Sequence, residues 1–151
     1  MKKNGFTIAI VTALAVFFCG CDALDPEPPP YVVSKPVCCI EANEGYYRFA
    51  GIEFDFLNTS PKNVCRFTVA CMVYDADTNE DPFIGSNTVQ FTYEGDIPKN
   101  ESRSLSISLD PYIYVAPEKP FLIDFFHVTR IEYVDGSSWE DETGIYYTRS
   151  Y

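Results

Sequence analysis

The sequence predicts an all-β protein, an antiparallel β-sandwich of about seven strands that follows a signal peptide and a proline-rich tether. Three observations predict this class. Short segments of alternating apolar and polar residues recur after residue 37, clusters of turn-forming residues separate them, and no sustained helical period occurs after the N-terminal segment. Aromatic residues make up 16% of the 151 residues, and these favour strands and bury large areas.

The first twenty residues have the composition of an export signal. Lys2 and Lys3 form a positive start, and residues 6–18 form an apolar stretch. That stretch is shorter than the roughly 20 apolar residues needed to span a bilayer, but it matches the core of a secretory signal. We therefore expect residues 1–20 to be a signal peptide.

The signal ends in the sequence FCGC, which resembles a bacterial lipobox, the site where an export signal is cut before a lipidated cysteine. Cys21 matches the lipidated cysteine and Gly20 the small residue before the cut, while Phe18 replaces the usual leucine. Cys19 is the weaker candidate because bulky Phe18 would directly precede the cut. The resemblance implies palmitate-type acyl chains on Cys21, and two or more such chains anchor a protein stably to a membrane.

This resemblance also implies a location in the bacterial cell envelope, membrane-anchored on the periplasmic face or at the cell surface. In lipoproteins of enteric type, an aspartate directly after the lipidated cysteine implies retention at the inner membrane. That rule does not hold in every bacterial group, so Asp22 does not decide which leaflet carries the anchor. The alternative is an ordinary secreted protein whose signal contains cysteines.

Residues 21–36 are acidic and proline-rich, reading CDALDPEPPPYVVSKP. Proline favours extended polyproline II, and at about 3.1 Å per residue this segment could hold a domain up to roughly 45 Å from a bilayer. We expect it to be a tether, and residues 37–151 to form one domain.

Two segments carry the strongest strand patterns. In residues 48–56, Ile52, Phe54 and Phe56 alternate with acidic residues, and in residues 64–74 a second apolar face alternates with a polar one. A period of two is typical of a half-buried strand. The predicted inward residues of the second segment are Cys65, Phe67, Val69, Cys71 and Val73.

Four further segments complete the predicted sandwich. Residues 86–95 and 103–110 alternate, with Val89, Phe91, Tyr93, Leu105, Ile107 and Leu109 expected to face inward. The pattern of residues 121–134 changes register near residues 126–128, where we expect a bulge. Asp135–Gly136 predicts a hairpin turn, and the last arm starts near Trp139 and includes residues 144–148.

Residues 54–80 resemble the paired-strand core of small immunoglobulin-like domains in bacterial lipoproteins, including those called FxLYD. The shared pattern is a strand ending in Asn-x-Ser, a short turn, and a long alternating strand ending in Tyr-Asp. Residues 97–102 and 130–139 resemble later turns of such domains. The resemblance implies an immunoglobulin-like sandwich and brings no active site.

Four cysteines follow Cys21, namely Cys38, Cys39, Cys65 and Cys71. Cys65 and Cys71 lie about 20 Å apart along one strand, and adjacent Cys38 and Cys39 would need a strained ring. Either one of the first pair is joined to one of the second by a disulfide, or all are free thiols. Their spacing does not match a zinc site.

Asp75, Asp77, Asn79 and Asp81 have the spacing of the first half of a calcium loop. Glu80 and Ser86 occupy the positions where such a loop requires glycine and glutamate. Acidic residues and asparagine also favour ordinary turns. We expect a turn, with calcium binding as the alternative.

The sequence offers no catalytic constellation. His127 is the single histidine and is surrounded by apolar residues, and no nucleophile motif, zinc motif or glycine-rich phosphate loop occurs. We expect a structural histidine, no catalytic residue, no metal and no cofactor. Trp139 is expected to fill the core, whereas exposed loop tyrosines would favour a binding patch. The candidates are Tyr112, Tyr114, Tyr146, Tyr147 and Tyr151.

The formal net charge is −11, which disfavours nucleic acid as a partner. Together these observations predict a non-enzymatic, lipid-anchored envelope protein that acts through protein contacts, as an accessory subunit or adhesin. The alternative function is an exported ligand- or calcium-binding module.

Overall fold

The computed structural model describes residues 27–148, and within this range the chain consists of strands, loops and one short 3-10 helix, η1. The predicted signal peptide and Cys21 lie outside the described residues. The elements in chain order are β1 (Tyr31–Val33), β2 (Val37–Asn43), β3 (Tyr46–Asn58), β4 (Val64–Tyr74), β5 (Thr88–Ile97), β6 (Ser102–Ser108), η1 (Asp110–Tyr112), β7 (Leu122–Tyr133) and β8 (Ser138–Glu140).

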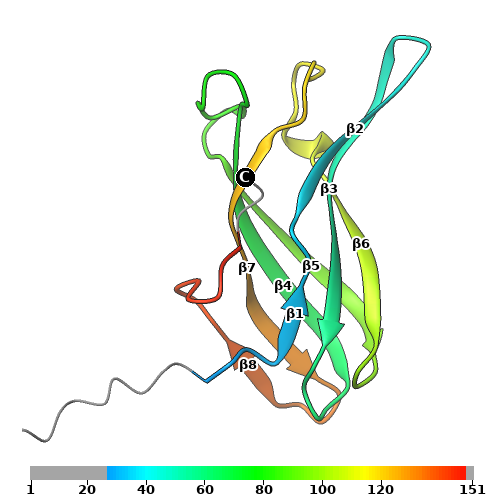
Figure 1. The fold of residues 1–151 in the computed structure, drawn as a ribbon, viewed down its shortest axis with the longest axis vertical. Helices are drawn as coiled ribbons and strands as arrows, with labels where there is room; N and C mark the ends of the chain where they lie inside the picture. The colour runs from blue at the N-terminus through cyan, green and yellow to red at the C-terminus, as the bar shows by residue number, and fades with distance from the viewer. Residues whose placement is uncertain (1–26, 149–151) are drawn as a thin grey trace, which may run out of the picture.

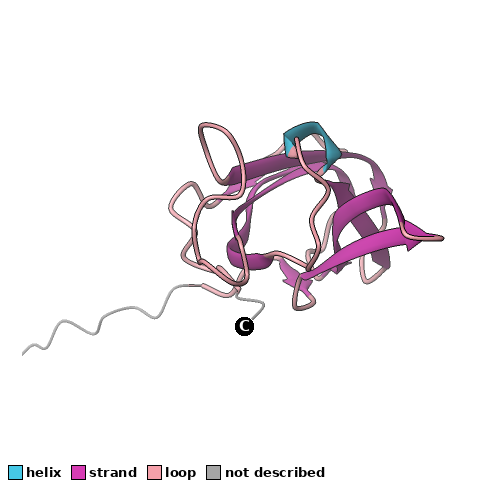
Figure 2. Ribbon diagram, turned by 90° about the horizontal axis from the view of Figure 1, so that it is seen from above, coloured by secondary structure: helices cyan, strands magenta, loops and turns pink. Residues whose placement is uncertain are grey.

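The strands form two antiparallel sheets, which confirms the predicted β-sandwich (Figure 1). In sheet A, β1 and β2 both pair with one edge of β3, and β6 pairs with the other edge. Sheet B has the order β5-β4-β7-β8. Seen from above, the strands surround one core, while the β2–β3 hairpin extends beyond it (Figure 2).

The alternating residues of the long strands fill this core as the sequence predicts. Ile52, Phe54 and Phe56 of β3 are buried and meet the buried residues of β4 and β7 from the other sheet. Phe54 packs edge-on against Phe126, with ring centroids 4.8 Å apart. Burying a side chain of this size stabilises the fold by roughly 1.5–3 kcal/mol.

The predicted inward position of Cys65 is wrong. A bulge in β4 lies between Val64 and Arg66, so Val64 is fully buried and Cys65 is only half-buried. The Cys65 thiol donates to the Glu132 carbonyl oxygen at 3.4 Å. The extra residue of a bulge shifts the alternation that follows it, which brings Phe67 back into the core.

The sandwich begins inside the segment predicted to be a tether. Tyr31–Val33 pairs with the end of β3, and the Tyr31 ring is buried beside Phe56 at 5.8 Å. A break at residues 34–36 separates β1 from β2. There the Ser34 N–H donates to the Asp55 carbonyl and the Ser34 hydroxyl accepts from the Asp55 N–H, so the backbone of β3 stays satisfied.

The predicted bulge in β7 is confirmed. The register of β7 against β4 shifts between Ala70 and Met72 and between Thr68 and Val69. Phe125 has a φ of 51°, a left-handed conformation that is uncommon for an aromatic residue. The shift leaves both Phe126 and His127 buried.

The predicted last arm is interrupted after three residues of β8. Asp141 is buried and its carboxylate accepts the backbone N–H groups of Ile145 and Tyr146, which closes a turn. Thr148 then rejoins sheet B through an isolated bridge to Phe126. The chain therefore leaves the sheet after β8 and returns to it only at Thr148, the last described residue of the predicted arm.

Candidate functional site: the distal loops

The two ends of the sandwich differ in which segments of the chain lie there. The described N-terminal residues join the lower end of Figure 1, where the Thr59 N–H donates to the Pro30 carbonyl at 3.1 Å. The loops at the opposite end are residues 75–87, between β4 and β5, and residues 109–121, between β6 and β7. We call these two segments the distal loops. Because β4 has 11 residues, the two ends lie about 35 Å apart.

The first distal loop begins with a tightly hydrogen-bonded turn. One carboxylate oxygen of Asp75 accepts the backbone N–H groups of Asp77 and Thr78, each at 2.9 Å, and the Thr78 hydroxyl at 3.1 Å. The Asp75 N–H donates to the Glu80 carbonyl, and the Asn79 N–H donates to the Asp75 carbonyl. The backbone donors, that of Thr78 first, lower the pKa of Asp75.

The acidic residues of this turn do not gather around a cation site. Both carboxylate oxygens of Asp77 lie 2.8 Å from the Lys119 ammonium, and Asp75 is occupied by the turn. Within residues 27–148, no group of three or more histidine, cysteine, aspartate or glutamate side chains could hold a metal ion. The turn prediction for residues 75–81 is therefore the interpretation that the geometry favours.

The two distal loops are fastened to each other by aromatic rings. Phe83 is buried, and its ring lies 5.6 Å from that of Tyr112 and 5.7 Å from that of Phe121. The Asp77–Lys119 ion pair adds a second link, although exposed pairs of this kind contribute little energy. A hollow of about 320 Å³ lies between the loops, lined by Asp77, Val115 and Phe121 among others.

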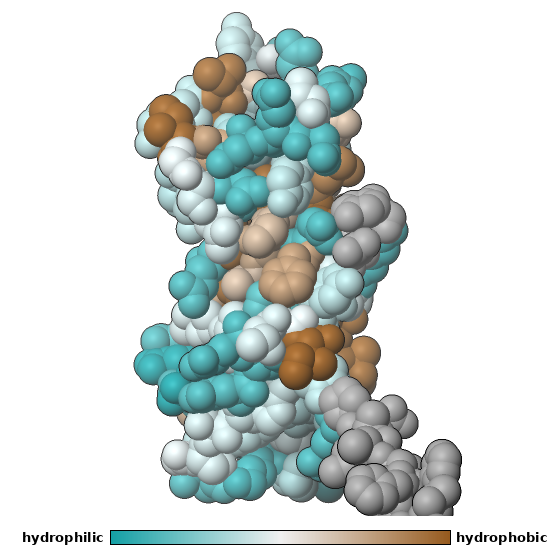
Figure 3. All heavy atoms as spheres, turned by 90° about the vertical axis from the view of Figure 1, so that its left-hand side faces the viewer, coloured by the Kyte–Doolittle hydropathy of each residue, from teal (hydrophilic) through white to brown (hydrophobic). Residues whose placement is uncertain are grey.

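Large apolar side chains stand exposed on this support. Ile84 is 80% exposed, Tyr114 76% and Val115 81%. The predicted exposure of the loop tyrosines holds for Tyr114, whereas Tyr112 is half-buried in the aromatic cluster. Figure 3 shows strongly hydrophobic side chains at this end of the molecule, among hydrophilic ones.

Charge distinguishes the two ends of the sandwich. The distal loops contain six acidic side chains and one basic side chain, Lys119, for a net charge of −5. The loops at the opposite end are residues 59–63, 98–101 and 134–137, and these contain two basic and two acidic side chains. Between these two sets of loops, the excess of acidic side chains therefore lies at the distal end.

His127 is buried, packed against an aromatic ring and within hydrogen-bond distance of a backbone carbonyl. Its ring is 5% exposed and its Nδ1 lies 2.8 Å from the Phe125 carbonyl oxygen, with the Phe125 ring 4.9 Å away. Gly144 packs directly against both rings. A Cβ at that position would lie 2.6 Å from a ring carbon of Phe125 and 3.3 Å from a ring carbon of His127. The hydrogen-bond partner of the imidazole is thus a backbone carbonyl, and a catalytic nucleophile is not among its described contacts.

Trp139 is half-buried and packs against the core. It packs edge-on against Tyr31 at 5.4 Å and lies 6.0 Å from Tyr146. Tyr147 is 41% exposed and contacts Phe125 at 5.0 Å, while Tyr151 lies outside the described residues. Tyr147 therefore lies against the bulge in β7, and Tyr146 lies against Trp139.

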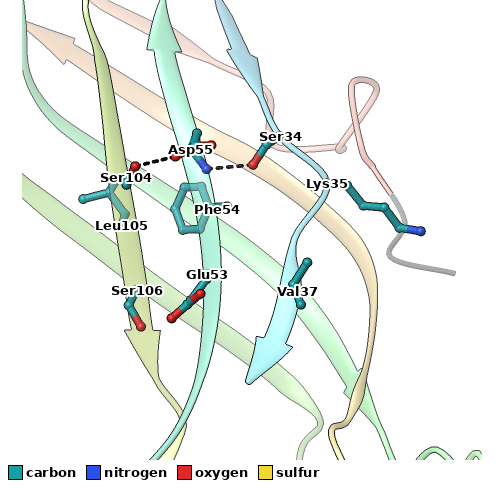
Figure 4. A pocket seen from close by; sticks show the side chains of 9 residues that line it. All are labelled: Ser34, Lys35, Val37, Glu53, Phe54, Asp55, Ser104, Leu105 and Ser106. Atoms are coloured by element: carbon teal, nitrogen blue, oxygen red, sulfur yellow. Dashed lines mark hydrogen bonds between the residues drawn. The ribbon is translucent and has the colours of Figure 1, made fainter. Parts of the chain in front are cut away.

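A second hollow lies on the outer face of sheet A, beside the break between β1 and β2 (Figure 4). It has a volume of about 540 Å³ and is lined by Glu53, Asp55, Ser104 and Ser106 among others. The Ser104 hydroxyl donates to the Asp55 carboxylate at 2.6 Å. Val37 and Leu105 add apolar surface to this open groove, and the Asp55 carboxylate is already hydrogen-bonded within the protein.

All four cysteines among the described residues are free thiols, so no disulfide joins Cys38 or Cys39 to Cys65 or Cys71. Cys38 of sheet A and Cys71 of sheet B are buried in the core, whereas Cys39 and Cys65 are half-buried. Burial raises the pKa of Cys38 to about 11 and that of Cys71 to about 12. Both buried thiols are therefore protonated at neutral pH, and the thiolate, which is the reactive form, is disfavoured.

Comparisons with known proteins bear on the fold alone. No family model matches the chain, and no curated protein matches it in sequence. A similar solved structure is a crystal structure from Peptoclostridium difficile 630, described as that of a hypothetical protein, with a TM-score of 0.55 and 10% identity. The similarity covers 76% of this chain and 88% of that one. Over the part of the chain that the structure describes, no helix is long and apolar enough to cross a membrane.

Proposed function

We propose that this chain is a lipid-anchored protein of the bacterial cell envelope, held to a membrane through Cys21, and that its sandwich acts through protein contacts and not through catalysis. The observation that carries the proposal is the placement of three of the four most exposed large apolar side chains among the described residues. Ile84, Tyr114 and Val115 lie on loops at the end opposite to the tether. When one end of a domain is attached to a membrane, the opposite end is the surface that is most accessible to protein partners.

The chemistry of the described residues supports a contact role over catalysis. His127 is packed and hydrogen-bonded to backbone, the buried thiols are protonated, and the acidic residues of the first distal loop are engaged in a turn and an ion pair. A catalytic site needs a nucleophile, base and orienting group within hydrogen-bond reach. Exposed apolar side chains on a rigid loop support are instead a feature of interaction surfaces.

Expression of full-length Cys21→Ser in the source bacterium tests the anchor. The wild type should incorporate a labelled fatty acid and sediment with membranes, and Cys21→Ser should do neither, because the thioether can no longer form. Cys19→Ser is the matched control and should remain labelled and membrane-bound. Labelling that persists in Cys21→Ser, or an unlabelled wild type, would refute the anchor.

A further inference from the structure

We infer that the distal loops form a docking surface for a protein partner whose matching surface combines apolar side chains with lysine or arginine. This inference rests on the proposed function, since it names the surface and the partner chemistry of the contact proposed there. Four properties of the distal loops lead to it: their apolar residues, their rigidity, their charge and their hollow.

The apolar residues provide the attraction. Ile84 comes from the first distal loop, and Tyr114 and Val115 come from the second, so both loops contribute. Covering such side chains gains about 25 cal/mol for each Å² of apolar surface removed from water. Tyrosine is also enriched at the centres of protein interfaces.

Rigidity lowers the cost of binding. The aromatic contacts of Phe83 with Tyr112 and Phe121 hold the two loops together, and the turn around Asp75 fixes the start of the first. Asp81 adds a further constraint, because its carboxylate accepts the Phe83 N–H at 2.9 Å. A surface that is already ordered spends less conformational entropy on association.

Charge selects the partner. The distal loops carry a net charge of −5, and Lys119, their one cation, is paired with Asp77. Such a surface repels anionic lipid and nucleic acid, and it attracts a cationic protein surface from a distance. The matching surface therefore needs lysine or arginine around its apolar centre.

The hollow between the loops fits one long cationic side chain. Val115, Pro117 and Phe121 supply apolar walls, and Glu118 supplies a carboxylate at the rim. Asp77 and Lys119 also line the hollow, but they are paired with each other. Lysine and arginine bury an apolar stem and keep a charged head at the rim. At about 320 Å³, the hollow is at the lower end of the range for ligand pockets, which suits a single side chain.

Site-specific photo-crosslinking in the source bacterium tests the inference. The full-length protein would carry p-benzoylphenylalanine in place of Ile84 or Val115, with two other exposed valines, Val37 at 56% and Val134 at 64%, as control positions. Val37 reports on the outer face of sheet A and Val134 on the end near the tether. We expect protein adducts several-fold more abundant from the two distal positions, joined to a partner segment that contains lysine or arginine.

Two further measurements test the charge. Raising the ionic strength of permeabilised cells from about 0.05 M to 0.5 M should lower the adduct yield, because surface charges are then screened. Neutralising Glu80 and Glu118 together to glutamine should lower it too, whereas Glu142→Gln, an exposed change outside the distal loops, should not. If neither higher ionic strength nor the double substitution lowers the adduct yield, the inference that the partner surface carries lysine or arginine is wrong.

The control positions separate this inference from the proposed function. Adducts formed mainly from Val37 or Val134 would overturn the distal docking surface and leave the protein-contact function standing. An absence of protein adducts from all four positions would overturn both. The lipid anchor is judged independently by the Cys21→Ser fractionation.

Discussion

Phe56 of β3 and Phe67 of β4 stack face to face across the two sheets, with ring centroids 4.2 Å apart and an interplanar angle of 10°. Both side chains are nearly inaccessible to solvent. Phe56 also contacts Tyr31 of β1, so this stack joins the first strand of the chain to both sheets.

Phe56→Ala should therefore lower the free energy of unfolding by about 3–5 kcal/mol, since a large cavity replaces the ring. Chemical denaturation of both proteins would measure the loss. Tyr46→Ala removes a ring that is 77% exposed, and it should change the stability by less than about 0.5 kcal/mol. Equal effects of the two substitutions would contradict the described core.

Asn58 should be the most sensitive buried polar position. Its side-chain amide donates to the carbonyls of Lys62 and Ile97, and its oxygen accepts the N–H and hydroxyl of Ser60. Asn58→Ala would leave these groups without partners, at a cost of about 2–4 kcal/mol in unfolding free energy. Asn43→Ala, at the exposed end of β2, is the matched control and should be close to neutral.

The four thiols of the folded domain should differ in reactivity. At pH 8 iodoacetamide should label Cys39 and Cys65, which are half-buried, well before Cys38 and Cys71. Burial raises the pKa of the latter two and excludes the reagent, and the thiolate is the reactive form. Mass spectrometry of peptides would give each rate, and all four should react alike in denaturant. A disulfide detected between Cys38 and Cys71 would contradict the free thiols described here.

Stability should fall as the pH rises above about 9. Burial raises the pKa of Cys71 from 9.0 to about 12 and that of Tyr31 from 10.0 to about 12. The unfolded chain loses these protons first, so ionisation favours unfolding from the unfolded pKa upward, until the folded pKa is reached. Denaturation midpoints between pH 7 and pH 11 would show the decline, and Cys71→Val should make it shallower. An unchanged slope in Cys71→Val would argue against the buried thiol as a cause.

Removal of metal ions should leave the domain unchanged. Asp75 is held by backbone donors and Asp77 by Lys119, so a chelator has no described site to empty. The melting temperature with and without EDTA should agree, and added calcium should not raise it. A shift of many degrees would instead favour the calcium-binding alternative.

Much of the fold could be predicted from the sequence because strict alternation survives in the long strands. Ile52 and Phe54 follow the period of two, and the register change in β7 is visible in the sequence itself. The sequence does not reveal β1, because three residues among prolines are too few to show a period. The alternation predicts an inward Cys65, because the β4 bulge depends on pairing with β5 and β7, which no local pattern encodes.

The distal loops were only partly predictable. A loop tyrosine such as Tyr114 carries a general tendency toward interfaces, and its exposure was expected. Ile84 and Val115 gave no such signal, because an apolar residue in a loop is as often buried as exposed. Their exposure follows from Phe83 and Phe121, which occupy the buried positions beneath the loops. The concentration of charge at one end likewise appears only when both loops are placed together.

The break at residues 34–36 has a mechanical consequence. It lets the chain begin at the lower end of the sandwich and pair β1 lengthwise with β3. A stretching force applied between the N-terminal segment and the distal loops would then act parallel to the strands. Such a force shears the hydrogen bonds of β1 together instead of peeling them off singly, so the domain resists tension most strongly in the direction in which a tethered protein would be stretched.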